Sequence, residues 1–311
     1  MRSNGLIGEL AALGAAFLWA ASSVGYGSLG KRIPPLELNL IKGAIALFFL
    51  TITLAIQALI QQDFTLVTLQ IPLQTFGLLI LSGVIGIGIG DTAYFHAINN
   101  LGARRTLLIE TLASPLSAIL AMAFLQEVLS SFAWLGILLT LLGVAWVISE
   151  RTPAVGTVKH PLIGVGWGLM AAGCQATGAV MSRSAFVAGE VNAVWSTALR
   201  LFGGLVIVLI LLKVQSVKSG GAEIKNLPGI TFTKKLILAL VIIAFSSTYL
   251  GIWLQQISLK FAPAGIAQTL LGTSPLFVLP IVFLRGEHIS WRACLGVMVA
   301  IVGIALLFTV G

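Results

Sequence analysis

Residues 114–148 read SPLSAILAMAFLQEVLSSFAWLGILLTLLGVAWVI, and residues 274–308 read SPLFVLPIVFLRGEHISWRACLGVMVAIVGIALLF. The two stretches lie 160 positions apart and share ten identities in 35 aligned positions without a gap. The identities include Ser-Pro-Leu, one Glu and two glycines, and a shared apolar composition does not readily bring these into one register. The chain therefore contains an internal duplication, which is the first clue to its architecture.

The composition places both copies in a membrane. Apolar residues make up 58% of the 311-residue chain, charged residues only 9%, and the mean hydropathy is +1.05. A soluble domain carries about 25% charged residues, so a chain this poor in charge could not cover a surface in water. Apolar runs long enough to cross a bilayer predict membrane-spanning helices at 6–28, 36–58, 74–98, 104–125, 131–149, 162–187, 191–213, 234–258, 263–284 and 291–310.

The duplication divides these ten spans into two equal halves. We expect a first five-helix repeat over 1–150, a linker over 151–161 and a second repeat over 162–311. Because five is an odd number, the second repeat must enter the membrane upside down relative to the first. Inverted repeats are typical of transporters, whose sites lie near the midplane between the repeats. The predicted fold is an all-α membrane protein of ten transmembrane helices in two inverted five-helix repeats.

Several residues also carry a family resemblance that runs over about residues 6–310. They are Trp19, Lys42, Arg200, Ser114-Pro115, Ser274-Pro275, Gly136, Gly143, Gly286-Glu287, Gly296 and Gly303. In this order the chain resembles the EamA-type ten-helix transporters of the drug/metabolite transporter superfamily. It departs from their pattern at Lys42, where Arg is more frequent, and at Gln126, where Gly is usual. The resemblance implies a transporter of small organic metabolites and names no substrate.

Charged residues inside the spans are the candidate site, because each costs roughly 2.5–3.5 kcal/mol to insert and so usually faces a partner or water. We call the side of the termini side A and the opposite side B. Helix rise places Lys42, Asp91 and Glu110 about 10 Å from side B, at the depth of Ser22 and Ser23. The alternative to a wet functional cluster is a structural ion pair between Lys42 and one acid. We predict that Lys42 and Glu110 depend on one another.

The second repeat contributes Arg200, about 13 Å from side A by the same rise, with no obvious acid partner in its own half. A guanidinium suits a carboxylate or phosphate of a ligand, although backbone carbonyls or an acid of the first repeat could also bind it. Trp19 and Gln175 occupy equivalent repeat positions. Pro115 and Pro275 should kink their helices and free the carbonyls of Thr111 and Leu271. The further predicted cavity-lining residues are Thr111, Ser114 and Ser274.

Other motifs have structural interpretations. Gly86-xxx-Gly90 lies in a predicted span with no strand before it, so it indicates close helix packing rather than a phosphate loop. Glu9 and Arg183 lie near span ends, where long side chains reach water. Glu127 and Glu287 precede the fifth and tenth spans, where acids stabilise helix starts. Dispersed basic residues argue against nucleic-acid binding, and we expect neither a metal nor a cofactor.

These features favour a secondary transporter over an enzyme, since His96 has no nucleophile or metal partner at close spacing. A non-transporting scaffold or receptor is the alternative. One cation and two acids in the first repeat, with an unpaired Arg200 in the second, favour a zwitterion such as an amino acid. An apolar amphiphile bound by Trp19 and Phe17 is the second candidate. An acid or His96 could carry a coupling proton. The residues distinguish neither exporter from importer nor monomer from homodimer.

The basic residues also predict an orientation in the cell membrane. Thirteen lie on side B and three, Arg2, Arg183 and Lys260, lie on side A. Because positively charged loops stay in the cytoplasm, we predict that side B is cytoplasmic and both termini are outside. The family resemblance implies the reverse orientation.

Overall fold

The computed structural model describes residues 2–29, 33–61, 71–149, 161–218, 233–284 and 290–310, and within these ranges the regular elements are all helical. The first repeat consists of α1 (Arg2–Leu29), α2 (Pro35–Gln61), α3 (Leu73–Gly83), η2 (Val84–Gly90), α4 (Asp91–Leu101), α5 (Ala103–Glu110), α6 (Ala113–Leu125) and α7 (Ser131–Ser149). The second consists of α8 (Pro161–Ala188), α9 (Ala193–Lys218), α11 (Lys234–Ile243), η3 (Ala244–Leu250), α12 (Gly251–Phe261), α13 (Ala264–Leu271), α14 (Ser274–Leu284) and α15 (Trp291–Val310). Of the predicted linker 151–161, all but Pro161 lies outside the described residues.

The elements combine into ten membrane-crossing rods within the described residues, as predicted. α3, η2 and α4 run on without a break, as do α11, η3 and α12, whereas α5–α6 and α13–α14 are each interrupted by a two-residue turn. Eight of the rods, α5–α6 among them, are apolar and long enough to span a bilayer. The exceptions are the shorter α13–α14 and α8, which is rich in glycine and polar residues and lies against α3, η2, α4, α5 and α6. α8 can therefore cross the bilayer although it is less apolar, because much of it packs against other helices and not against lipid.

The outer surface is apolar and the interior holds the polar side chains, as a bilayer requires. Exposed side chains include Leu59, Ile60, Phe124, Phe132 and Trp291. Buried polar or charged side chains include Asn39, Lys42, Arg200, Gln255 and Gln256. This distribution is the opposite of that in a soluble domain, and it places the intramembrane charges among protein groups, where such residues almost always lie.

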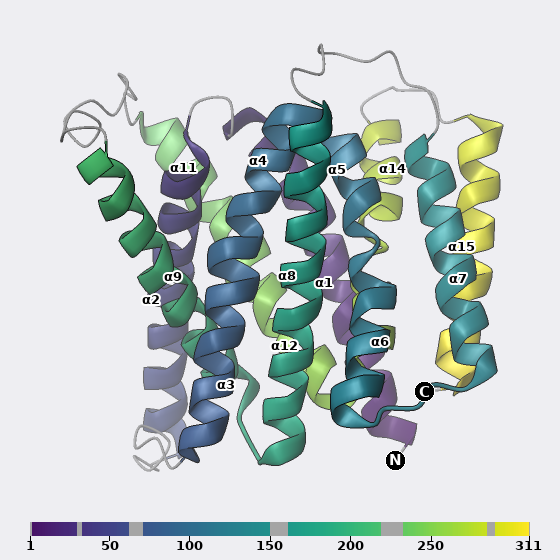
Figure 1. Cartoon of the computed structure of the whole chain (residues 1–311), viewed down its shortest axis with the longest axis horizontal. Coiled ribbons are helices and arrows are strands. Elements are labelled where there is room, and N and C mark those ends of the chain that lie inside the picture. The colour runs from purple at the N-terminus through teal and green to yellow at the C-terminus, as the bar shows by residue number, and fades with distance from the viewer. Residues whose placement is uncertain are drawn as a thin grey trace.

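The two repeats interdigitate, so each packs against the equivalent elements of the other. α1 packs on α12, α13 and α14 of the second repeat, and its counterpart α8 packs on α4, α5 and α6 of the first. α2 packs on α9, and α7 packs on α15. Figure 1 shows the pair α2 and α9 at one end of the molecule and the pair α7 and α15 at the other, with both chain termini on one side. The termini therefore share side A, as five plus five spans demand.

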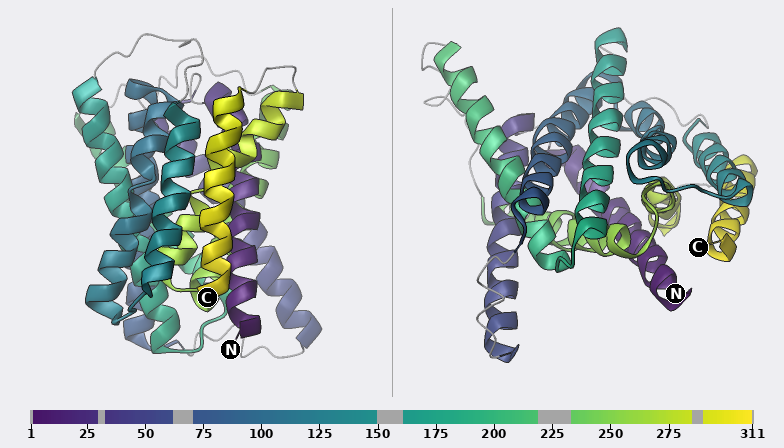
Figure 2. Two further views of the ribbon diagram at one scale, coloured as in Figure 1. Left: turned by 90° about the vertical axis from the view of Figure 1, so that its right-hand side faces the viewer. Right: turned by 60° about the horizontal axis from the view of Figure 1, so that its bottom comes forward.

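The last helices of the two repeats form a close pair of their own. Figure 2 shows α7 and α15 side by side at the edge of the bundle. Their contact runs along glycines: a Cβ at Gly143 would lie 2.5 Å from the carbonyl oxygen of Gly296, and one at Gly136 would lie 3.0 Å from that of Gly303. Small residues let two backbones approach this closely without side chains between them. The glycines that revealed the duplication thus join the repeats.

Each repeat also contains a π-helix at the same place. η2 and η3 begin at Val84 and Ala244 and end at Gly90 and Leu250, which reproduces the 160-residue offset of the sequence repeat. A π-helix widens the helical turn, shifts the backbone hydrogen bonds and is frequent at functional sites. Both π-helices lie in the third rod of their repeat, where that rod meets the first and second helices of the opposite repeat.

The helix breaks fall where the two Ser-Pro motifs predict them. Turns at 111–112 and 272–273 separate α5 from α6 and α13 from α14. The backbone N–H of Ser114 donates to the Thr111 carbonyl at 3.2 Å in a tight turn, so that carbonyl is reused locally. The Ser114 hydroxyl donates across the repeats to the Gln268 carbonyl at 3.0 Å. The broken rods therefore cross one another near their breaks, since α6 packs on α13.

Candidate functional site

Lys42 forms an ion pair inside the bundle, and its partner is Asp91. α2 presents Lys42 and the start of α4 presents Asp91, with Nζ 2.5 Å from Oδ2. The ammonium also lies 5.1 Å from the ring centroid of Phe95. The sequence correctly placed both residues at one depth, but the predicted pairing of Lys42 with Glu110 is wrong. A neighbouring acid and ring offset the cost of burying the ammonium.

Glu110 Oε2 has no hydrogen-bonding partner among the described residues. It is the last residue of α5, immediately before the turn at 111–112. Its Oε2 atom is buried and accepts no hydrogen bond, and the side chain is close enough to Asp91 for the two charges to interact. Because Asp91 is already neutralised by Lys42, Glu110 is the uncompensated carboxyl group of this polar cluster. An unpaired buried acid requires a proton, a cation or a ligand donor.

Side chains bind both π-helices at equivalent carbonyls. Asn39 Nδ2 donates to the Ile87 carbonyl of η2 at 2.9 Å. Trp19 Nε1 donates to the Ser247 carbonyl of η3 at 2.8 Å. Ile87 and Ser247 are 160 residues apart, so the same backbone oxygen is bound in each repeat by a different side chain. Tyr26 adds a hydroxyl contact of 2.6 Å to the Ser247 hydroxyl. Trp19 therefore binds η3 with its indole N–H.

Arg200 is the buried cation of the second repeat. Its residue is 1% exposed, and Nε and Nη1 have no hydrogen-bond partner. A Cβ at Gly86 of η2 would lie 3.2 Å from Nη2 and 3.7 Å from the Gln175 amide oxygen, so the guanidinium and Gln175 meet beside this glycine. Among the described residues Arg200 has no salt-bridge partner, although it is close enough to Asp91 for their charges to interact.

Among the residues that the structure describes, the unpartnered buried polar atoms are segregated between the repeats. Those in the second repeat include only nitrogen donors and one hydroxyl: Arg200 Nε and Nη1, Gln255 Nε2, Gln256 Nε2 and Ser258 Oγ. Those in the first include only oxygens: Glu9 Oε1, Asn39 Oδ1, Glu110 Oε2 and Ser117 Oγ. Ser196, four residues from Arg200 on α9, donates to Gln256 Oε1 at 2.7 Å, which places Gln256 within one helical turn of the guanidinium.

The chain matches the model of the EamA-like transporter family over residues 6–149 and 162–309. It belongs to the EamA-like transporter family. The two matched segments are the two repeats, so the family assignment and the observed duplication agree. The chain is therefore a multi-pass membrane protein of a transporter family, as the sequence resemblance implied.

A solved structure, described only as a crystal structure of a protein, has the same fold. It has a TM-score of 0.73 and 17% sequence identity, and the alignment covers 98% of this chain and 96% of that chain. At this identity the likeness concerns the fold alone. Comparison with curated proteins returned no match.

The remaining predicted site residues of this EamA-like transporter have local or structural contacts. Ser22 is buried, and the side chain of Ser23 lies outside the described residues. The Thr111 hydroxyl donates to the Leu108 carbonyl at 2.7 Å, Ser274 is the half-buried first residue of α14, and the Gln175 carbonyl is 3.5 Å from Gln268 Nε2. Gln256 and Gln268 therefore form hydrogen bonds to neighbouring helices.

A second ion pair of the transporter corrects two further interpretations. Arg183 Nε lies 2.6 Å from Glu127 Oε1, and Nη1 donates to the carbonyls of Leu259 and Lys260 at 3.0 and 2.8 Å. Glu127 Oε2 accepts from the Ala264 N–H at 3.0 Å. Arg183 is therefore bound to protein groups with 17% of its side chain exposed, and Glu127 binds the start of α13 rather than its own helix. Glu287 lies outside the described residues.

Sequence reasoning missed Asn39 as a member of the polar interior. Asn39 precedes Lys42 by three residues and therefore shares its helix face. That spacing was the available signal for Asn39.

Proposed function

We propose that this EamA-like transporter carries a small zwitterionic metabolite, such as an amino acid, by alternating access between its inverted repeats. The observation that supports the substrate class is the segregation of the unpartnered buried donors and acceptors. Arg200 and the glutamine amides present donors from the second repeat, and Glu110 and Asn39 present acceptors from the first.

The charge balance favours a zwitterion over an ion of one sign. Lys42 and Asp91 neutralise each other, which leaves Arg200 and Glu110, among the described residues of the polar interior, as a base and an acid without an ion-pair partner. A carboxylate matches the planar, two-pronged donor face of a guanidinium. An ammonium supplies the donors that Glu110 Oε2 lacks. A dicarboxylate or phosphate ester would bring negative charge to Glu110 without a second free cation.

The symmetry of the fold supplies a route for alternating access. Equivalent elements pack across the repeats, and both repeats carry a π-helix and a broken rod at the same positions. Two copies of one shape can exchange conformations, so that the site opens to either side in turn. The driving energy would come from the substrate gradient or from a coupled proton. Glu110 is the carboxyl group best placed to carry that proton, because no basic side chain forms an ion pair with it among the described residues.

The two aromatic residues that favoured an apolar amphiphile, Trp19 and Phe17, have other contacts. The indole N–H of Trp19 is committed to the Ser247 carbonyl. Phe17 is half exposed on the outside of α1, where it meets Phe277 edge to face with the ring centroids 5.9 Å apart. An outward phenyl ring faces lipid rather than a ligand between the repeats. His96 stacks on Trp167 with the ring centroids 4.9 Å apart, so it too has a packing role.

The test is a metabolite screen on the purified protein followed by flux in proteoliposomes. We expect amino acids to raise the melting temperature and to be transported, with Arg200→Gln and Glu110→Gln each weakening binding at least tenfold, about the value of one charged hydrogen bond. Arg105→Gln removes an exposed basic residue and should behave as wild type. Stabilisation by dianions alone would contradict the zwitterion, and no flux of any metabolite would favour a scaffold or receptor. Flux indifferent to a pH gradient would exclude proton coupling.

A further inference from the structure

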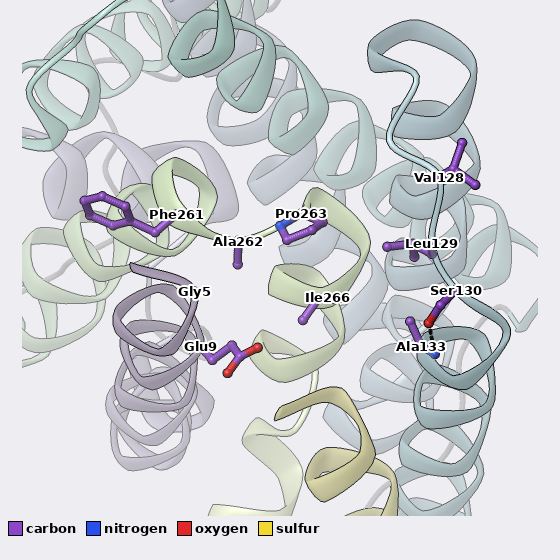
Figure 3. A pocket seen from close by; sticks show the side chains of 10 residues that line it. All are labelled: Gly5, Glu9, Val128, Leu129, Ser130, Ala133, Phe261, Ala262, Pro263 and Ile266. Carbon is purple, nitrogen blue, oxygen red and sulfur yellow. Dashed lines mark hydrogen bonds between the residues drawn. The ribbon is translucent and has the colours of Figure 1, made fainter. Parts of the chain in front are cut away.

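A pocket on side A lies apart from the polar interior. It has a volume of about 250 Å³ and lies between the start of α1, the connection from α6 to α7, and the turn that joins α12 to α13. Its lining residues are Gly5, Glu9, Val128, Leu129, Ser130, Ala133, Phe261, Ala262, Pro263 and Ile266. Figure 3 shows the Glu9 carboxylate directed from α1 toward the helix that carries Ile266.

Glu9 is the unusual member of this pocket. The sequence placed it near a span end, where its side chain could reach water, but in the structure it is only 2% exposed. Its Oε1 atom is buried and accepts no hydrogen bond. Of the side-A cations whose side chains the structure describes, Arg183 binds Glu127, and Lys260 Nζ donates to the Val191 carbonyl at 3.0 Å. A buried carboxylate without a donor is costly, so the pocket is complete only when something supplies one.

The lining determines what that donor can be. The side chains that line the pocket are apolar except for those of Glu9 and Ser130, and the Ser130 hydroxyl already accepts from the Ala133 N–H at 3.2 Å. A divalent cation would find one carboxylate where it needs six or more oxygen ligands. An anion would be repelled. An organic ammonium supplies both positive charge and N–H donors, and its hydrocarbon part suits Val128, Leu129 and Ile266.

We propose that this pocket is a binding site for a primary ammonium group attached to an apolar body, with Glu9 as its counter-ion. The volume is roughly that of eight water molecules at ~30 Å³ each, enough for an ammonium and a short chain. Val128 in the lining is exposed, and so are Leu6, Leu10 and Phe132, which neighbour lining residues in the sequence. The ammonium could therefore come from a lipid headgroup or from a free amphiphilic amine. This site is independent of the proposed substrate.

The first experiment uses n-octylamine on the full-length protein in detergent, with thermal unfolding and calorimetry as readouts. We expect n-octylamine to stabilise the wild type, while octan-1-ol and octanoate do not. Glu9→Gln should weaken n-octylamine binding at least tenfold, because it removes the charge and keeps the shape. Glu190→Gln removes an exposed side-A acid as a matched control and should bind like the wild type. Equal n-octylamine affinity in Glu9→Gln and wild type would overturn the proposal.

A second variant guards against a folding defect of Glu9→Gln. Val128→Trp keeps the carboxylate but adds bulk at an exposed position of the lining, and it should also weaken n-octylamine binding. Unchanged binding in Val128→Trp would place the amine elsewhere and overturn the proposal.

The lipid source is tested in nanodiscs of phosphatidylethanolamine or phosphatidylcholine, whose quaternary headgroup has no N–H. Glu9-dependent stabilisation by phosphatidylethanolamine identifies a lipid ligand. Glu9-dependent stabilisation by n-octylamine alone identifies a free amine. Stabilisation by neither would contradict the site.

Discussion

At the scale of single residues, the charged side chains of the interior divide into paired and unpaired groups. Lys42 with Asp91 and Arg183 with Glu127 are closed pairs, each with further contacts to a ring or to backbone groups. Arg200 and Glu110 have no such partner among the described residues. Removing one member of a buried pair costs more than replacing both, because it leaves a charge without compensation. Paired and unpaired residues should therefore respond differently to neutral substitutions.

We predict that Lys42 and Asp91 are energetically coupled. Lys42→Met and Asp91→Asn should each lower the thermal stability in detergent, by about 3–5 kcal/mol where the remaining charge stays buried. The double variant should recover part of that loss, with a coupling energy of roughly 0.5–3 kcal/mol. A double-mutant cycle on the melting transition measures this coupling. The cycle of Lys42→Met with Glu110→Gln is the control and should be close to additive, because those side chains share no hydrogen bond. Additive losses in the first cycle would contradict the pairing.

At the scale of elements, the end of α3 and the following η2 lie very close to α9 of the opposite repeat. A Cβ at Gly83 would overlap the carbonyl oxygen of Arg200, and one at Gly204 would lie 3.2 Å from the Gly83 carbonyl oxygen. A Cβ at Gly86, on the α8 side of η2, would lie 3.7 Å from the Cα atom of Gly178. The glycines thus position Arg200 by bringing its own backbone against the third rod. The interpretation of Gly86-xxx-Gly90 as a packing motif is confirmed, since both glycines face α8.

We predict that Gly83→Ala strongly destabilises the protein, because the new methyl group meets a backbone atom that cannot rotate away. The two rods would have to separate, and Arg200 would move with α9. Gly77→Ala in the same helix is a matched control, since a Cβ there has nothing within 4 Å. Thermal unfolding with fluorescence-detected gel filtration measures both variants. We expect a loss of several kcal/mol for Gly83→Ala, in the upper range of single substitutions, and little change for Gly77→Ala. Equal behaviour of the two variants would contradict this packing account.

The elements also show where sequence reasoning reaches its limit. The ten spans, the breaks before Pro115 and Pro275, and the common depth of Lys42 and Asp91 follow from hydropathy, proline chemistry and helix rise. The identity of the partner of Lys42 does not follow from these rules, because the helix rise gives the depth of a residue but not the rotation of each helix about its axis. The π-helices were also missed: they depend on a shift of backbone hydrogen bonds that has no residue signature in η2 or η3.

At the scale of the whole molecule, the inverted repeats share one fold but differ in chemistry. The first repeat places Lys42, Asp91 and Glu110 toward side B, while the Arg183–Glu127 pair joins α8, the α6–α7 connection and the α12–α13 turn at side A. Equivalent positions hold different residues, as with Trp19 and Gln175. A duplicated scaffold can therefore keep symmetric hinges while its two halves specialise, one for acceptors and the other for donors.

The orientation of the whole molecule is the last prediction. Both termini lie on side A (Figure 1), so one reporter fixes the topology of every loop. Thirteen basic residues on side B against three on side A favour a cytoplasmic side B under the positive-inside rule. Two of those three, Arg183 and Lys260, are bound to protein groups, whereas Lys213 and Lys235 on side B are exposed. We therefore predict that both termini are outside, the reverse of the orientation that the family resemblance implied.

Fusions of alkaline phosphatase and green fluorescent protein to the C-terminus test this orientation, because the phosphatase folds only outside the cytoplasm and the fluorescent protein is bright only inside it. We expect an active phosphatase and a dark fluorescent protein. The matched control is a fusion after residue 155, in the predicted linker on side B, which should give the opposite pair of signals. A bright C-terminal fluorescent protein with an active phosphatase at residue 155 would place side A in the cytoplasm. The basic residues of side B would then lie outside the cell. Their excess would have to serve binding to a partner or to lipid headgroups there, and not the orientation of the protein in the membrane.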